Sequence, residues 1–248
     1  MERFGGGTEK TGLWQVTLPE EPSQRFLKRT GVVLRRNSWM EGDASVQLFL
    51  KGSGTTGVYI PGASRGSQRF GGALEPLVWG HFQLYQSKRR TYLKEIEVIE
   101  DFWGLRRIPQ AVAQALKWAK MLDRYLIAGY PYDDLLALFY WAQKALLEGA
   151  VPDLVHSRFL WRWLLSWGIA PDLRMCSICG QPLEGGGVWQ DGAFACARCA
   201  PRRALTDLGE FAEYALSNRF IPSKMTPGLL NQARLVAGLF MKNLDENR

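Results

Sequence analysis

Between Gly31 and Val98 the hydrophobic positions recur in short runs separated by glycine-rich turns. Alternation of apolar and polar residues puts every second side chain on one face, which predicts half-buried β-strands. The runs cover residues 31–36, 46–50, 58–60, 76–85 and 94–98. Five short strands so close together are typical of a small barrel of the oligonucleotide-binding (OB) type, although an SH3-like barrel would show a similar pattern.

After Pro109 the hydrophobic spacing lengthens to three and four residues, which predicts helices. The first helix carries an apolar stripe of Val112, Leu116, Ala119, Leu122 and Leu126. Further helices are predicted over residues 131–148, 154–167, 206–218 and 226–244. The segment 154–167 is apolar on all sides, so we expect it at the centre of the core. The predicted fold class is α+β, with a five-stranded barrel followed by an α-helical domain.

All four cysteines of the chain lie in two Cys-x2-Cys pairs, Cys176 with Cys179 and Cys196 with Cys199. Two intervening residues let both thiolates of a pair bind one ion, and the glycine-rich loop between the pairs completes a tetrahedron. Four thiolates suit one structural zinc ion and leave no open position for water or substrate. Two disulfides are disfavoured because the sequence shows no signal peptide. An iron–sulfur cluster stays open on spacing alone.

These patterns divide the chain into parts. We expect an N-terminal extension over 1–30, a nucleic-acid-binding barrel over 31–108, a helical domain over 109–175 and 200–248, and a zinc-binding loop over 176–199. The beginning of the chain is polar and glycine-rich, and no apolar run approaches the length that spans a bilayer. We therefore expect a cytoplasmic protein with no membrane partner.

The net charge of +7 resides mainly in the N-terminal part, where residues 1–108 contain 16 Lys and Arg against 11 Asp and Glu. A solvated basic surface would show the same excess. Here, however, the cations are interleaved with Trp39, Tyr59, Phe70, Trp79 and Tyr85. This mixture suits single-stranded nucleic acid, because cations follow the phosphates while bases stack on rings. The candidate DNA-binding cations are Arg35, Arg36, Lys51, Arg65, Arg69, Lys88, Arg89 and Arg90.

No catalytic constellation is evident. The two histidines, His81 and His156, have no recognisable serine, cysteine or carboxylate partner. The sequence also contains no Gly-x4-Gly-Lys phosphate loop. We predict a protein that is not an enzyme.

The segments Gly31–Arg36 and Gly62–Pro76 resemble the N-terminal barrel of the bacterial recombination mediator family RecO. Residues 158–165, followed by Gly168–Leu173 and Cys176–Gly180, are similar to the same family's passage from helical core to zinc loop. The similar segments follow one another along the chain in the same order as in the family. The resemblance implies an OB barrel, a helical domain with an inserted zinc element, and DNA repair and homologous recombination as the function.

The same resemblance implies partners. Proteins of this family bind single- and double-stranded DNA and anneal strands coated with the single-strand DNA-binding protein. With RecR they help RecA to load onto coated DNA. The family's helical domain accepts the acidic tail of the single-strand DNA-binding protein, for which Leu116, Lys120 and Arg124 are our candidates.

The chain departs from the family pattern in three places, one of which is that its C-terminal helices are short. The extension before Gly31 is unusual, and the segment 51–62 lacks the cationic stretch expected beside the third strand. Two other functions also fit a barrel with a zinc knuckle. One is a zinc-containing RNA-binding or ribosome-associated module, and the other is a nucleic-acid-modifying enzyme with an unrecognised active site.

Overall fold

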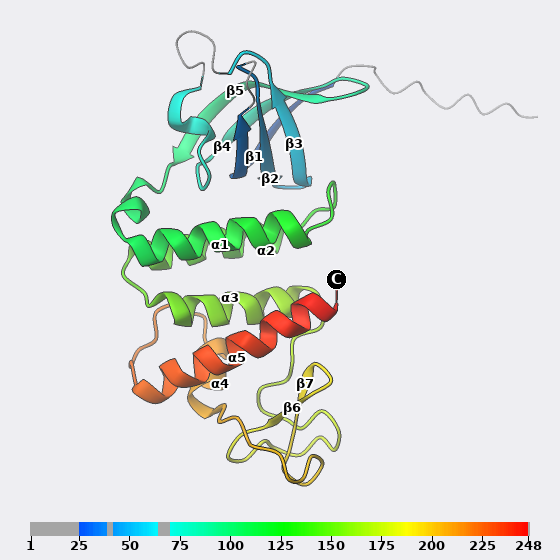
Figure 1. Cartoon of the computed structure of the whole chain (residues 1–248), viewed down its shortest axis with the longest axis vertical. Coiled ribbons are helices and arrows are strands. Elements are labelled where there is room, and N and C mark those ends of the chain that lie inside the picture. The colour runs from blue at the N-terminus through cyan, green and yellow to red at the C-terminus, as the bar shows by residue number, and fades with distance from the viewer. Residues whose placement is uncertain (1–24, 39–41, 64–69, 248) are drawn as a thin grey trace, which may run out of the picture.

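The computed structural model describes residues 25–38, 42–63 and 70–247 of the chain (Figure 1). Its N-terminal part is a closed barrel of β1 (Arg25–Ser38), β2 (Ala44–Leu50), β3 (Gly54–Ile60), β4 (Trp79–Gln86) and β5 (Thr91–Glu100). Two short 3-10 helices flank the last two strands, η1 (Gly71–Leu74) before β4 and η2 (Trp103–Arg107) after β5.

The strand order distinguishes between the two predicted barrels. The strands follow the order β1-β2-β3-β5-β4, and β4 pairs with β1 to close the barrel. All pairs are antiparallel except β3 and β5, which run parallel and meet at Tyr59 and Tyr92. This is the Greek-key arrangement of the OB fold. The predicted OB-type barrel is confirmed, and the SH3-like alternative is wrong.

The first strand begins at Arg25, ahead of the start expected at Gly31. Its first six residues pair only with β4, from Arg25 opposite Gln86 to Thr30 opposite His81. That partner lies far along the chain, so the local pattern around Lys28 and Arg29 gave no sign of a strand. Residues 1–24 of the expected extension lie outside the described residues.

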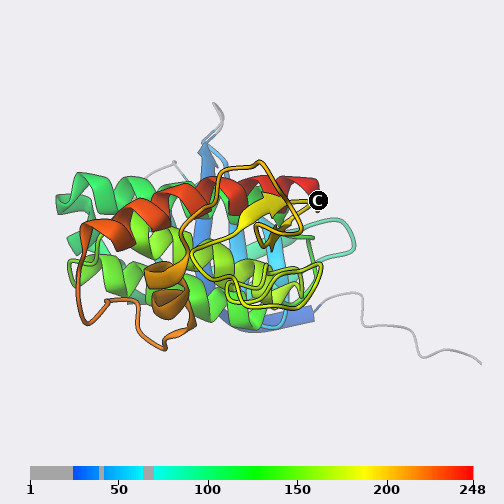
Figure 2. The ribbon, with the colours of Figure 1, turned by 90° about the horizontal axis from the view of Figure 1, so that it is seen from below.

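Below the barrel the helices form successive layers (Figure 1). The helices are α1 (Pro109–Tyr125), α2 (Asp133–Leu147), α3 (Pro152–Ser166), α4 (Gly209–Leu216) and α5 (Pro227–Glu246). α1 and α2 lie next to the barrel, α3 and α5 follow, and α4 lies beyond them with the hairpin of β6 (Val188–Gln190) and β7 (Ala193–Ala195). Seen from below, this hairpin lies against α5 (Figure 2), where the rings of Trp189 and Phe240 are 6.4 Å apart. The predicted α+β class is confirmed.

One apolar core joins the barrel to the helices. Trp79 of β4 packs on Phe139 and Tyr140 of α2, at ring-centroid distances of 5.9 and 5.1 Å. α3 buries side chains on all sides, as its sequence predicts, and fully buried Phe159 and Trp163 contact each other at 5.8 Å.

The buried face of α1 differs from the predicted stripe. Ala115, Trp118 and Leu122 are fully buried, whereas Leu116 is 39% exposed. α1 contacts both β1 and α3, and the stripe alone did not reveal a helix packed on two sides. The helix predicted over 206–218 is shorter, since α4 covers only Gly209–Leu216.

The turn between β2 and β3 fixes the barrel on the helices. Gly54 has a φ of +61°, and a Cβ atom there would collide with the carbonyl oxygen of Tyr130 in the α1–α2 connection. Glycine alone tolerates both this conformation and this approach. The backbone N–H of Gly52 donates to Asp133 Oδ1 at 2.7 Å. In the described part of the chain, no helix combines the length and the apolar character that a membrane crossing requires.

Candidate nucleic-acid interface and metal centre

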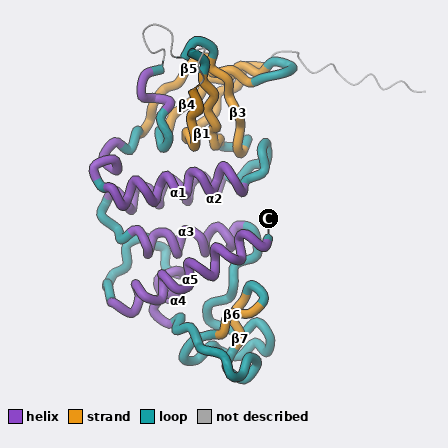
Figure 3. The backbone as a smooth tube through the Cα atoms, in the orientation of Figure 1, coloured by secondary structure: helices purple, strands orange, loops and turns teal. Residues whose placement is uncertain are grey.

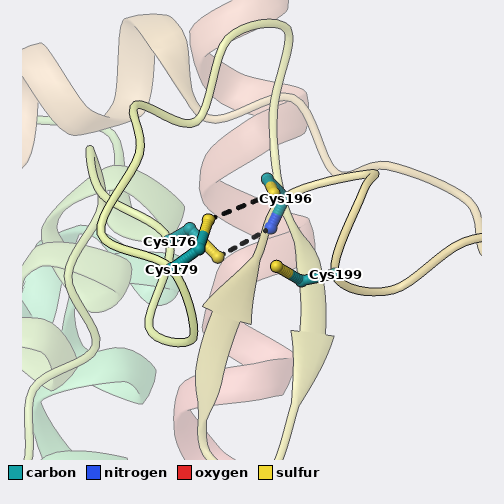
Figure 4. Close-up of side chains that lie close together, drawn as sticks. All are labelled: Cys176, Cys179, Cys196 and Cys199. Carbon is teal, nitrogen blue, oxygen red and sulfur yellow. Dashed lines mark hydrogen bonds between the residues drawn. The ribbon is translucent and has the colours of Figure 1, made fainter.

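The four cysteines converge on one point beside the β6–β7 hairpin (Figure 4), which lies at the end of the molecule opposite the barrel (Figure 1). Their sulfur atoms all lie within 4.8 Å of one another, and Cys179 Sγ lies 3.8 Å from Cys196 Sγ. In a tetrahedral zinc site with bonds of about 2.3 Å, sulfur atoms are about 3.8 Å apart. All four thiols are free, so the two-disulfide alternative is wrong. The cluster can bind one metal ion.

Backbone N–H groups lower the pKa of two of the cysteines, Cys176 and Cys196, and so favour the thiolate form that a metal requires, whereas hydrogen bonds from the neighbouring thiols raise the pKa of Cys199. The N–H of Cys196 donates to Cys176 Sγ at 3.2 Å. Hydrogen bonds from the backbone of Cys179 and Cys196 lower the pKa of Cys176 to about 6. Tight turns place these donors, because the N–H of Gly180 reaches the carbonyl of Cys176 and that of Cys199 reaches the carbonyl of Cys196.

The lobe around the cysteines has little core of its own. Its buried apolar cluster consists of Cys176, Val188, Ala195 and Ala200. A core this small contributes little burial free energy, so a bound ion would supply much of the lobe's stability.

A groove of about 500 Å³ crosses the outer face of β1, β2 and β3 and ends at the turn between β4 and β5. Among its lining residues are Arg35, Asn37, Ser45, Gln47, Tyr59, Lys88, Arg89 and Arg90. In OB folds, the face of strands 2 and 3 and the loop between strands 4 and 5 form the usual oligonucleotide-binding surface. The groove therefore brings Arg35 together with the three cations of the turn, although they lie far apart in sequence.

The turn between β4 and β5 holds its cations in solvent. The Ser87 hydroxyl accepts hydrogen bonds from the N–H groups of Arg89 and Arg90 and donates to the Arg90 carbonyl at 2.9 Å. Lys88, Arg89 and Arg90 are all exposed. The Arg90 guanidinium lies 4.9 Å from the centre of the Tyr59 ring, so cation and ring share one end of the groove. In Figure 3 this turn projects beyond the body of the barrel.

The other candidate cations lie elsewhere. Arg36 does not line the groove and forms an ion pair with Glu75 at 3.1 Å. Lys51 is exposed in the β2–β3 turn, at the end of the barrel that faces the helices. Arg65 and Arg69 lie outside the described residues, as does Trp39.

Sequence reasoning missed the polar groups between these cations. Asn37, Ser45 and Gln47 line the groove from β1 and β2. Ser45 and Gln47 lie on the outward face of β2, next to buried Ala44, Val46 and Leu48, whereas Asn37 lies between Arg36 and Ser38 in β1. The alternation that predicts β2 also places Gln47 on its outer face, but positive charge as the criterion for DNA-binding residues selects the cations alone.

The candidate partner-binding residues form an exposed row on α1. Leu116, Lys120 and Arg124 are four residues apart and all exposed. Of the three, Arg124 also lines a cavity of about 780 Å³ between the α1–α2 connection and the end of α3. Asp133 and Asp134 line the same cavity, with exposed Ile127 and Tyr130.

Comparison with protein-family models shows which family this chain resembles. The model of the N-terminal region of recombination protein O matches residues 25–102, and the model of its C-terminal region matches residues 109–225. The chain belongs to the RecO family. The first model begins where β1 begins, and the second includes all four cysteines.

Curated relatives carry the same name. DNA repair protein RecO of Anaeromyxobacter sp. (strain K) is 33% identical over 181 residues, which cover 71% of each chain. DNA repair protein RecO of Listeria monocytogenes serotype 4b (strain F2365) is 27% identical over 154 residues, or 62% of this chain. DNA repair protein RecO of Exiguobacterium sibiricum is 30% identical over 153 residues. The chain spans about 60% of the length of the Listeria and Exiguobacterium relatives.

Proposed function

We propose that this RecO-family chain is a non-enzymatic mediator of DNA repair and homologous recombination. In this role it binds single- and double-stranded DNA and anneals complementary strands. The observation that carries the proposal is the groove on the barrel, where Arg35, Lys88, Arg89 and Arg90 meet beside Tyr59.

Electrostatic capture is the proposed mechanism of binding. The cations of the groove would contact backbone phosphates and release the counterions condensed on DNA, so affinity falls steeply with salt. Such contacts carry no sequence information, which suits a protein that must act on any strand. Arg36, Lys51, Arg65 and Arg69 lie away from the groove or outside the described residues, so we propose them only as contacts for DNA that extends past it.

The surroundings of the histidines support a role without catalysis. His81 Nδ1 lies 2.9 Å from the hydroxyl of Thr30, and His156 Nδ1 accepts a hydrogen bond from Trp118 Nε1 at 3.0 Å. The His156 imidazole is thus bound by an indole, which is not a nucleophile, and the Thr30 hydroxyl meets His81 as a directly opposed pair of β1 and β4.

The metal of the cysteine cluster is proposed to be a single zinc ion. Thiolates that are all within reach of one ion suit a mononuclear site, and a closed four-thiolate shell is typical of structural zinc. Cys176, Cys179, Cys196 and Cys199 would hold it, and the ion would keep the β6–β7 lobe folded against α5.

The proposed partners are RecR, the single-strand DNA-binding protein and, through them, RecA, in the bacterial cytoplasm. The acidic tail of the single-strand DNA-binding protein would meet Lys120 and Arg124 and pack an apolar side chain on Leu116. Asp133 and Asp134 would repel the tail from the neighbouring cavity, so we place it along the exposed row of α1.

The deciding experiment is annealing of complementary strands coated with the single-strand DNA-binding protein. We expect the chain to accelerate annealing and a variant with Lys88, Arg89 and Arg90 replaced by Gln to lose the effect. Failure of folded, zinc-loaded protein to anneal would contradict the proposal. Preference for RNA over DNA in competition would favour the RNA-binding alternative, and turnover of the nucleic acid would favour an enzyme.

A further inference from the structure

Four aromatic side chains form a row across the barrel beside the groove. Tyr59 of β3 is opposite Tyr92 of β5, Tyr92 is opposite Tyr85 of β4, and Tyr85 is opposite Phe26 of β1. Successive ring centroids are 5.8, 6.2 and 5.2 Å apart. Directly paired residues of neighbouring strands project to the same face of the sheet. The four rings therefore make one continuous strip that starts in the groove at Tyr59.

The strip faces solvent rather than the core. Phe26 is 73% exposed, and the three tyrosines are partly exposed. The adjacent residues Leu27, Leu84 and Leu93 point the other way, into the barrel. A large apolar ring as exposed as Phe26 adds little to folding, so its position calls for another explanation.

Cations accompany the strip. The register of β4 and β5 shifts between Gln83 and Leu84, so Lys94 and Glu95 are both exposed on the outer side. Lys94 Nζ lies 5.1 Å from the centre of the Tyr85 ring, as Arg90 does at 4.9 Å over Tyr59. A bulge of this kind re-aims a side chain, here a lysine toward the strip.

The nearby acids are engaged by other side chains. Glu95 accepts a hydrogen bond from Gln83 Nε2 at 2.7 Å, and Glu97 forms an ion pair with Lys28 at 3.5 Å. Lys28 thus offsets the charge of Glu97, whereas Glu95 keeps its charge, as does Asp43, which accepts a hydrogen bond from the Tyr59 hydroxyl. The cations that lie over the rings are Arg90 and Lys94.

We infer that Phe26, Tyr85, Tyr92 and Tyr59 form a stacking platform for the unpaired bases of single-stranded DNA. The platform continues from the OB groove around the barrel to the start of β1. The inference rests on the proposed DNA-binding function and deepens it by naming where bases lie. Every base presents a flat face to an exposed ring, so stacking needs no particular sequence. In a duplex the faces of the bases are covered by their neighbours, so the platform selects single strands.

The test uses the full chain and oligo-dT, with a blunt duplex of the same length as comparison. Phe26→Leu and Tyr92→Leu keep an apolar side chain but remove the stacking face. Each should weaken oligo-dT binding on the order of tenfold, as loss of one stacked base does, and change duplex binding less than twofold. The matched control is Trp103→Leu in η2, because Trp103 is 59% exposed and also lies under a cation, Arg106, away from the strip.

A second measurement does not depend on any variant. Ultraviolet cross-linking of wild-type protein to oligo-dT carrying 5-iododeoxyuridine should label at least one of Phe26, Tyr85 and Tyr92, the platform residues outside the groove that Tyr59 lines. Unchanged oligo-dT affinity in both variants, equal losses for duplex, or cross-links confined to other residues would overturn the platform. If the variant with Lys88, Arg89 and Arg90 replaced still loses DNA binding, the proposed function stands without the platform. If wild-type protein binds no DNA, both fail.

Discussion

Arg35 Nε of β1 lies 2.9 Å from Asp123 Oδ2 of α1, so an arginine that lines the groove on the barrel also forms an ion pair with the helical domain. The carboxylate is mostly shielded, with 20% of its side chain exposed, whereas Arg35 is 53% exposed. The pair ties the barrel to α1, and in the proposed complex it would compete with a phosphate for Arg35.

Replacing Asp123 with Asn should therefore strengthen DNA binding. Exposed ion pairs contribute up to about 1 kcal/mol, which limits the gain in single-strand affinity to about fivefold. Fluorescence anisotropy with a labelled oligonucleotide measures the change. Glu75→Gln is the matched control, because it frees Arg36 outside the groove. A weaker complex for Asp123→Asn would show that the pair orients Arg35 for binding.

Neutralising the β4–β5 turn should lower both the affinity and its salt dependence. With Lys88, Arg89 and Arg90 replaced by Gln, three phosphate contacts are lost, so the slope of log affinity against log salt should flatten by about 2. Binding titrations at several salt concentrations give the slope. Lys242→Gln in α5 removes one exposed cation far from the groove and should leave the slope unchanged. An unchanged slope in the turn variant would move the phosphate path off the groove.

Removing one cysteine should release the metal without affecting the barrel. Cys196→Ser should lower the zinc content from one ion per chain to none, measured by mass spectrometry of the metal, and speed hydrogen exchange in β6 and β7. The lobe depends on the ion because its own apolar cluster is small. Oligonucleotide affinity should stay within twofold, since the helical layers separate the two ends (Figure 1).

Ser177→Ala is the control for this variant. It alters the same Cys-x2-Cys turn, but the hydrogen bond made there, to the carbonyl of Phe194, comes from the backbone N–H. It should retain the zinc. A loss of DNA binding in Cys196→Ser alone would show that the zinc lobe contributes to the interface directly.

His156 should make the protein less stable in mild acid. Burial and the nearby charge of Lys117 lower the pKa of His156 from 6.5 to about 4. Between about pH 4 and pH 6.5, His156 is therefore protonated in the unfolded chain and neutral in the folded chain. Stability is complete above about pH 6.5 and declines as the pH falls toward 4, by on the order of 3 kcal/mol in total.

Urea unfolding at pH 7.5 and 5 measures this loss. His156→Gln cannot take up the proton, so its stability should change less between the two pH values than that of the wild type. His81→Gln, at the other histidine, should behave as the wild type does. An equal loss in wild type and His156→Gln would assign the acid sensitivity to other groups.

Local patterns were sufficient to predict the strands and the cysteine cluster. Alternation identifies half-buried strands wherever both neighbours are close in sequence, as around Val46 and Leu48 in β2. The Cys-x2-Cys spacing similarly predicts the geometry of the cluster, because each pair lies in a tight turn that positions its two sulfur atoms.

Features set by distant pairing escaped the sequence. The strand start at Arg25 depends on pairing with Gln86, and the row of rings depends on the register among four strands. The sequence therefore places Phe26 in the expected extension over 1–30, whereas in the structure it pairs with Tyr85 and completes the row of rings. The predicted buried face of α1 was wrong for a similar reason. Trp118 is buried against Phe159 of α3, a contact that the periodicity of α1 alone does not reveal.

One pair of neighbouring strands in the closed barrel is joined by a narrow seam. β3 and β5 are paired at Tyr59 and Tyr92 alone, whereas β4 and β5 pair along their whole length. With so few hydrogen bonds to break, we expect the barrel to open locally at this seam before it opens elsewhere. A DNA strand laid over both tyrosines would bridge the seam from outside and hold it shut. Capture of a strand and stiffening of the barrel would then be one event, and the protein would be most rigid while it carries its cargo.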